Sequence, residues 1–314
     1  APPIPPSSSL TRLEAVQRSL QEKGFSQEAA EQISKSRRQS SRAVYNSKWR
    51  IFSDWCAGRS LDPFQVSVQQ LADFFMYLFN EKDLNPRTIK GYRSAISSTI
   101  SASGSRHEFS DSPEIGALLR SFQLERPPQR KILPQWNLSL VLNCLLKAPF
   151  EPIQSATLKD WTYKTIFLVA LATGRRRSEL HALCFDSDHF KQNQDQSSLK
   201  LYPDIGFLGK SQALDAVAQP IRLNAFSLVG SEDPDKRLCP VRALLHYRKL
   251  TTRDSIRKGR RKLFISFKPS FQKEIARGTL SSWIAKMVRL AYETEGSSPG
   301  ALELCKIKAH EVRA

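Results

Sequence analysis

Three consecutive arginines follow a Thr-Gly pair near the middle of the chain, and their types suggest binding of an oxyanion. The stretch from Leu171 to Leu183 reads LATGRRRSELHAL, and the apolar run 166–172 leads into it. This pattern predicts a buried helix, a tight glycine turn and the start of a second helix. A guanidinium held on a rigid core can donate two parallel hydrogen bonds to a phosphate or carboxylate. A surface loop with solvated charges fits the same residues equally well.

Other cationic residues further along the chain could complete such a site. Lys210 follows Gly209 at a place where a hairpin would turn. His310 and Arg313 are three residues apart, which puts them on one face of a helix. Each has an ordinary alternative, because a Gly-Lys pair is common in hairpins and a His-x-x-Arg pair is common on surfaces. The argument therefore depends on the set and its order.

In this order, and after a helical N-terminal region, the motifs resemble those of the tyrosine recombinase (phage integrase) family. The matching stretches are TGRRRSEL at 173–180, Gly209 with Lys210, and HEVR at 310–313. TIKGYRSAI at 88–96 looks like the helical core-binding domain of that family. The sequence KAHEVRA at 308–314 and the Trp-Cys pair at 55–56 look most like those of the recombinases of DIRS-type retroelements. The resemblance covers roughly residues 40–314.

The resemblance implies site-specific DNA recombination or integration for a mobile element, without a metal or other cofactor. A Tyr hydroxyl would attack a DNA phosphodiester, giving a 3′-phosphotyrosine and a free 5′-hydroxyl. Arg176 and Arg313 would clamp the non-bridging oxygens of the transition state. Lys210 would protonate the leaving oxygen, and His310 would donate to the phosphate or assist proton transfer from the Tyr.

Three further residues of the arginine turn take secondary roles in this interpretation. Glu179 would support the turn without touching DNA. Arg175 and Arg177 would be exposed or would contact the DNA backbone. The choice of Arg176 as the catalytic arginine depends on aligning the Thr-Gly pair with the family motif.

The nucleophile that the family places after His-x-x-Arg is not among these residues. Only Ala314 follows Arg313, and the seven tyrosines (45, 77, 92, 163, 202, 247 and 292) all precede His310. We expect a C-terminally truncated chain, a piece of a longer product, that binds DNA and does not cleave it. A decayed or reused element without cleavage activity is the other explanation.

The fold expected to carry these residues is mainly α with a small antiparallel β-sheet: a helical-bundle core-binding domain followed by an α+β catalytic domain of the tyrosine recombinase type. Residues 1–40 form a leader, disordered at first and then helical, and 41–124 form the helical, SAM-like DNA-binding domain. Residues 125–134 contain three prolines and are a linker. The catalytic domain takes 135–314, is C-terminally incomplete, and has strand-like runs at 199–202, 205–208 and 219–223.

One helix of the first domain carries a cationic stripe. Pro86 suits a helix start, and Ile89, Tyr92 and Ile96 recur at the spacing of a buried face. The opposite face is suited to DNA phosphates and base edges, and its candidate DNA-binding residues are Arg87, Lys90, Arg93 and Ser94.

The overall charge points to the same partner. Forty-eight Lys and Arg against 30 Asp and Glu give a net charge of +18, which is typical of proteins that bind nucleic acid. No apolar run reaches the ~20 residues of a membrane helix, so we expect no membrane partner. Five scattered cysteines without a C-x-x-C spacing argue against a zinc site and for a reducing compartment. DNA as the substrate and basic runs such as 257–262 lead us to expect a nuclear protein, although such runs serve equally well as phosphate contacts.

Three classes of function remain open from the sequence. The first is a recombinase that works as a tetrameric synaptic complex on double-stranded DNA. The second is a relative or fragment that binds DNA without cutting it. The third is a basic structural protein, such as a ribosomal or membrane-surface protein, with chance motif matches, and it predicts no salt-sensitive DNA binding.

Overall fold

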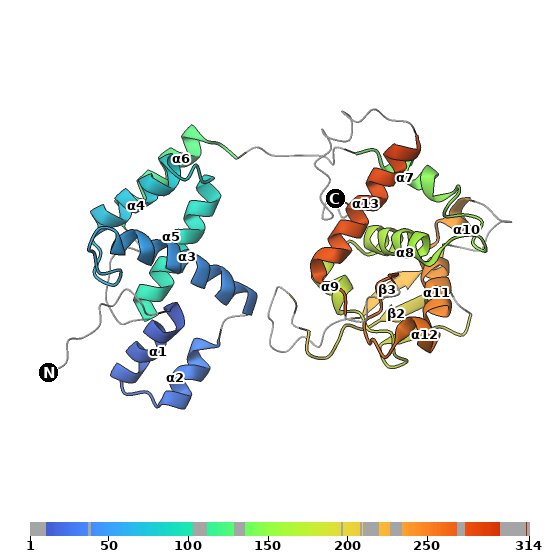
Figure 1. Ribbon diagram of the computed structural model, residues 1–314, viewed down its shortest axis with the longest axis horizontal. Coiled ribbons are helices and arrows are strands. Elements are labelled where there is room, and N and C mark those ends of the chain that lie inside the picture. The colour runs from blue at the N-terminus through green and yellow to red at the C-terminus, as the bar shows by residue number, and fades with distance from the viewer. Residues whose placement is uncertain are drawn as a thin grey trace. The chain divides into compact units, whose positions relative to one another are not determined.

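The chain forms two compact units that meet between Arg130 and Lys131, and each is described here by itself. The computed structural model describes residues 11–36, 39–102, 112–128, 136–195, 197–207, 209, 220–226, 234–268, 274–295 and 312. The described part is mainly helical and contains one small antiparallel sheet, so the fold class expected from the sequence is confirmed (Figure 1). No described helix is both long and apolar enough to cross a membrane.

The first unit is a helical bundle around one central helix. Its helices are α1 (Arg12–Glu22), α2 (Gln27–Ser34), α3 (Gln39–Ala57), α4 (Val68–Asn80), α5 (Pro86–Ala102) and α6 (Pro113–Glu125). Helix α5 contacts α1, α3, α4 and α6. Its apolar face, Ile89, Tyr92 and Ile96, is buried as the spacing predicts.

Aromatic rings fill the core of this bundle. The Phe74 ring of α4 lies 5.0 Å from Phe52 and 5.3 Å from Trp55 of α3, both edge-on. Phe79 stacks on Phe122 at 4.1 Å and thereby joins α4 to α6. Edge-to-face and offset pairs of this kind add about 0.5–1.5 kcal/mol each beyond the area that they bury. The aromatic residues that recur at helical spacing are therefore core residues.

Helices α1 and α2 pack on this bundle. The Arg12 side chain is buried, and its Nε donates to the Thr99 hydroxyl of α5 at 2.8 Å. Val16 and Leu20 of α1 and Ala30 of α2 form a small apolar cluster of their own. In the helical part of the expected leader, α1 thus lies against α5 and α3, and α2 lies against α1, while residues 1–10 are outside the described ones.

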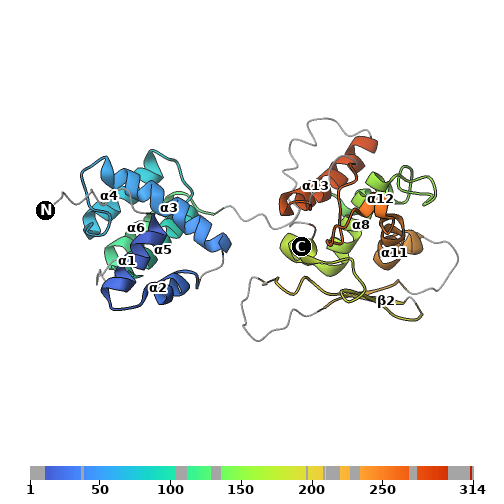
Figure 2. The same cartoon turned by 60° about the horizontal axis from the view of Figure 1, so that its bottom comes forward.

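The second unit is built around α8 (Leu158–Thr173), a helix that is apolar on almost every side. It contacts α11 (Pro240–Thr251), α13 (Arg277–Thr294) and strand β3 (Ile221–Asn224). Figures 1 and 2 both place α8 in the middle of this unit. The remaining helices are α7 (Leu138–Leu145), α9 (Arg177–Ala182), α10 (Pro234–Arg237) and α12 (Asp254–Arg257).

The sheet has three antiparallel strands in the order β1-β2-β3. They are β1 (Phe190–Gln192), β2 (Ser198–Leu201) and β3, and Leu199 pairs with Leu223 and Gln192 across the two ladders. The runs expected at 199–202 and 219–223 correspond to β2 and β3, and β1 was not predicted. The prediction of a strand at 205–208 is wrong for residues 205–207, which are described and form a turn. The Asp204 carboxylate accepts from the Gly206 N–H at 3.2 Å and makes a turn there, and Ile205 is 92% exposed.

One cation lies inside the core of the second unit. Lys164, in the middle of α8, is fully buried. Its Nζ donates to Glu151 Oε1 at 2.6 Å and to the Leu145 carbonyl at 2.9 Å. Arg242 Nη1 of α11 donates to the same Glu151 oxygen at 2.9 Å. The ammonium is satisfied only while this carboxylate is present, so the three side chains act as one unit.

We expect Lys164→Met to destabilise the protein strongly. Methionine fills much of the same volume but leaves Glu151 buried with one cationic partner, and breaking a buried pair in this way costs about 3–5 kcal/mol. Urea denaturation measures the change. Lys159→Met, an exposed position of the same helix, is the matched control and should stay within about 0.5 kcal/mol of the wild type. Equal stability of the two variants would contradict the role given to the pair.

Candidate functional site

The arginine triplet lies on a tight turn at the end of α8. Gly174 adopts φ 57° and ψ 15°, the left-handed conformation that ends many helices, and its N–H donates to the Ala170 carbonyl at 3.1 Å. The Thr173 hydroxyl donates to the Val169 carbonyl at 2.7 Å and accepts from the Arg175 N–H at 3.4 Å. Since α8 is surrounded by core, these bonds fix the backbone that enters the triplet. The helix, turn and helix predicted from the sequence are all present.

Arg176 follows in this turn and is the N-cap residue of α9. Its N–H donates to Glu179 Oε2 at 2.8 Å, and its carbonyl accepts from the N–H groups of Glu179 and Leu180 at 2.8 and 3.0 Å. The guanidinium Nη1 lies 3.6 Å from Glu179 Oε1. The Arg176 side chain is 49% exposed and that of Glu179 is 17% exposed. One carboxylate thus holds both the backbone and the head group of Arg176, and solvent still reaches the guanidinium.

The two neighbouring arginines have different surroundings. Arg175 is half-buried. Arg177 is exposed, and its Nη1 lies 3.5 Å from the hydroxyl of Ser281 on α13. At the other end of α9 the His181 Nε2 lies 2.6 Å from the Ile275 carbonyl. The sequence analysis did not single out Ser281 or His181, because they meet residues 104 and 94 positions away and no local pattern marks such contacts.

The other candidate catalytic residues, Lys210, His310 and Arg313, lie outside the described residues, so their roles stay predictions. Lys210 belongs to the connection between β2 and β3. Val312, between Glu311 and Arg313, is described: it is buried, and it packs in the core of the second unit.

The cationic stripe of α5 belongs to the first unit. Arg87, Lys90 and Ser94 are exposed, and Arg93 is half-buried and has an interaction partner. Lys90 Nζ donates to the Gln123 side chain of α6 at 3.0 Å. The Ser94 hydroxyl donates to the Lys90 carbonyl at 3.1 Å, which leaves its oxygen lone pairs facing solvent. This face offers donors and charge at one-turn intervals.

Two arginines of the basic run 257–262, Arg257 and Arg260, are buried, while Lys258 and Arg261 are exposed. Arg257 is only 6% exposed, and its guanidinium donates to the carbonyls of Thr251, Arg260, Lys262 and Leu263. Burial lowers its pKa to about 10. Arg260 is also buried, and it donates to the Arg257 and Ile256 carbonyls. The prediction that this run contacts phosphates is therefore wrong for Arg257 and Arg260, because their guanidinium groups donate to nearby backbone carbonyls.

Comparison with known proteins gives a similarity to solved structures. No model of a known protein family matches the sequence, and no curated protein matches it. Among solved structures, the chain is similar to one titled "Crystal structure of XerA recombinase". The TM-score is 0.33 and the identity 14%, over 96% of this chain and 80% of that one. The proposals below are therefore argued from the residues of this chain. Among the described residues, no group of three or more His, Cys, Asp or Glu side chains could hold a metal ion.

We expect Gly174→Ala to destabilise the protein by about 1 kcal/mol, because an L side chain is strained in the left-handed region. The same change at Gly278, in the first turn of α13, should be neutral or stabilising by up to ~1 kcal/mol, since alanine favours helix and nothing lies within 4 Å of the added carbon. Thermal or urea unfolding compares the two variants. A loss at Gly278 together with no loss at Gly174 would contradict the turn geometry.

Proposed function

We propose that this chain binds double-stranded DNA and acts in DNA breakage and rejoining as a recombinase of the tyrosine type. The observation that carries the proposal is the arginine turn. Three consecutive guanidinium groups stand at the end of a buried helix, and a single carboxylate, Glu179, holds the middle one. A fixed fork of this kind suits a phosphate, because its donors need little reorganisation on binding. The net charge of +18 favours a polyanion as partner.

The chemistry that we propose follows from the motifs. Arg176 and Arg313 neutralise the charge that develops on the non-bridging phosphate oxygens when a Tyr hydroxyl attacks. Lys210 gives its proton to the 5′-oxygen as that bond breaks, and His310 donates to the phosphate or takes part in moving the proton of the Tyr. The new 3′-phosphotyrosine bond keeps the energy of the phosphodiester, so rejoining needs no ATP. The Tyr itself would have to come from beyond Ala314.

The finer parts of the proposal depend on the resemblance in the sequence. We propose that the protein serves DNA integration for a mobile element of the DIRS retrotransposon type, works in the nucleus, and self-associates into a tetramer on two duplexes. The stripe of Arg87, Lys90, Arg93 and Ser94 would contribute DNA contacts from the first unit, and Arg175 and Arg177 would contact the DNA backbone beside Arg176.

A second candidate function is DNA binding without cleavage. It is favoured by one observation, namely that the exposed cationic residues of α5 and of the arginine turn suit a polyanion by themselves. A DNA-holding relative needs the cationic surfaces and does not need a nucleophile.

DNA binding should depend on the triplet and on salt. We expect Arg175, Arg176 and Arg177, changed together to Gln, to weaken binding to a duplex at least ~10-fold and to lower the slope of log affinity against log salt by about 2–3, since each lost phosphate contact removes about 0.9. Fluorescence anisotropy across a salt series measures both values. Gln keeps the Glu179 cap on the Arg176 backbone, so the turn should still form.

The matched control removes the same three charges elsewhere in the second unit. Lys249, Lys268 and Arg289 are exposed, and their change to Gln should lower the slope by less than 1. Equal effects of the two triple variants would mean that net charge alone drives binding. If the wild type binds the duplex with an affinity that does not depend on salt, the proposal is wrong and a structural protein is favoured.

Cleavage is tested with a nicked suicide duplex that traps a covalent adduct. The 314-residue chain should give none. A product that continues past Ala314 and includes a Tyr should give an adduct, and Arg176→Ala should abolish it while Arg175→Ala keeps it. Loss at Arg175 but not at Arg176 would overturn the assignment of the catalytic arginine. If the extended product binds DNA and forms no adduct, cleavage is excluded and DNA binding without cleavage is the function that remains.

A further inference from the structure

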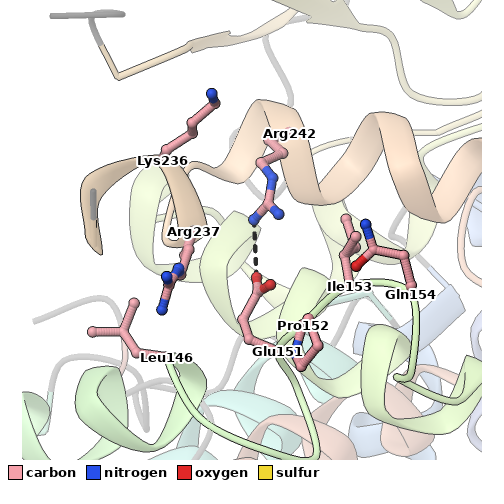
Figure 3. A pocket seen from close by; sticks show the side chains of 8 residues that line it. All are labelled: Leu146, Glu151, Pro152, Ile153, Gln154, Lys236, Arg237 and Arg242. Atoms are coloured by element: carbon pink, nitrogen blue, oxygen red, sulfur yellow. Dashed lines mark hydrogen bonds and ion pairs between the residues drawn. The ribbon is translucent and has the colours of Figure 1, made fainter. Parts of the chain in front are cut away.

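A small recess opens in the second unit between the segment 146–154, which follows α7, and the α10–α11 corner. Its volume is about 290 Å³. Glu151 and Gln154 lie on one side of the recess, and Lys236, Arg237 and Arg242 lie on the other (Figure 3). None of these residues belongs to the arginine turn. Figure 1 shows α9 and α10 toward opposite ends of α8, so the recess is a separate feature.

Glu151 is the one carboxylate among the described residues that line this recess, and it is already paired with cations. Glu151 Oε1 accepts from Lys164 at 2.6 Å and from Arg242 at 2.9 Å, and the Glu151 side chain is 7% exposed. Burial raises the pKa of this carboxyl, but the bonds from Arg242 and Lys164 outweigh it and hold the pKa below 4.5. Glu151 is therefore charged at neutral pH and pairs with two cations through Oε1.

The recess carries positive charge beyond this pairing. Among the described residues, neither Lys236 nor Arg237 forms an ion pair or a side-chain hydrogen bond. Among the side chains that the structure describes here, one carboxylate, Glu151, thus meets four cations, Lys164, Lys236, Arg237 and Arg242. Burial, and then the charges of Arg242 and Arg237, lower the pKa of Lys164 against the opposing effect of Glu151. The positive field of the recess therefore reaches the buried ammonium.

The guanidinium groups have a geometry that an oxyanion can use. In Figure 3, Arg242 points at Glu151 from above, Arg237 lies to the left of this pair, and Lys236 extends away from both. Arg242 uses Nη1 for Glu151 and its side chain stays 29% exposed, and its other donors have no recorded partner among the described residues. Arg237 is half-buried. Guanidinium forks match the oxygen spacing of phosphate groups and donate to them in pairs.

We propose that this recess binds a phosphate-class oxyanion between Arg237 and Arg242, with Lys236 at its edge. The Glu151–Lys164 pair holds Arg242 in place from behind and does not touch the ligand. A volume near 290 Å³ accepts a phosphate or diphosphate group and excludes a duplex. The anion is either a free small phosphate compound or a phosphate of a nucleic-acid chain that passes the mouth of the recess.

The test uses inorganic pyrophosphate as the probe, with titration calorimetry at constant ionic strength. The wild type should bind it saturably. Arg237→Gln should bind at least ~10-fold more weakly, because a neutral side chain replaces one fork. Lys249→Gln removes an exposed charge from α11 outside the recess and should bind as the wild type does. Lys236→Gln is the second variant, with a smaller loss, should Arg237→Gln fail to fold by circular dichroism.

A duplex-binding arm separates the two sources of the phosphate. If Arg237→Gln also weakens duplex binding while Lys249→Gln does not, the ligand is a backbone phosphate. This conclusion stands even if the wild type does not bind pyrophosphate. If only pyrophosphate binding falls, the ligand is a free small anion. Equal pyrophosphate affinity in the wild type and both recess variants overturns the proposal, as does no saturable binding combined with unchanged duplex affinity.

The arginine-turn triple variant keeps this proposal independent of the proposed function. It should retain the pyrophosphate affinity of the wild type, because its substitutions lie at the other end of α8. Failure of DNA binding and failure of the recess to bind an anion are therefore separate results.

Discussion

The second unit depends on the near-complete burial of α8. A helix that is apolar on almost all sides cannot face water, so α11, α13 and β3 must cover it. The same burial fixes the position of α8 within the unit. Its C-terminal end delivers the arginine turn, and the middle of the helix brings Lys164 to Glu151 and Arg242. Both cationic sites of this unit are thus positioned by one packing requirement and not by their own loops.

Lys164 shows how a buried charge restricts the arrangement around it. A buried ammonium needs its carboxylate, so the segment that carries Glu151 must lie against α8 and α11. The third member, Arg242, is partly exposed, and its bond to Glu151 fixes the position of its guanidinium at the surface. A core requirement therefore orients a surface guanidinium, which is the arrangement that a binding site needs.

The turn could be predicted because its signals are local. An apolar run, a Thr-Gly pair and a change of period determine a helix end, and Gly174 adopts the left-handed conformation that this pattern favours. The strand at 205–207 was predicted wrongly because its apolar residues outweighed the turn chemistry of Asp204 and Gly206. Strand β1 is three residues long, which is too short to show the alternation of apolar and polar residues that predicts a strand. The burial of Arg257 and the Glu151–Lys164–Arg242 group depend on contacts between distant residues, and composition assigns such cations to the surface.

Helix α9 has six residues, less than two turns, and a helix of that length is not stable alone in water. Its order comes from its neighbours: the Ser281 hydroxyl at one end and the Ile275 carbonyl at the other. The arginine turn, α9 and the start of α13 should therefore open and close as one cooperative unit of local unfolding. A phosphate bound at the turn would then lower the amide exchange of residues that it never touches, at the beginning of α13.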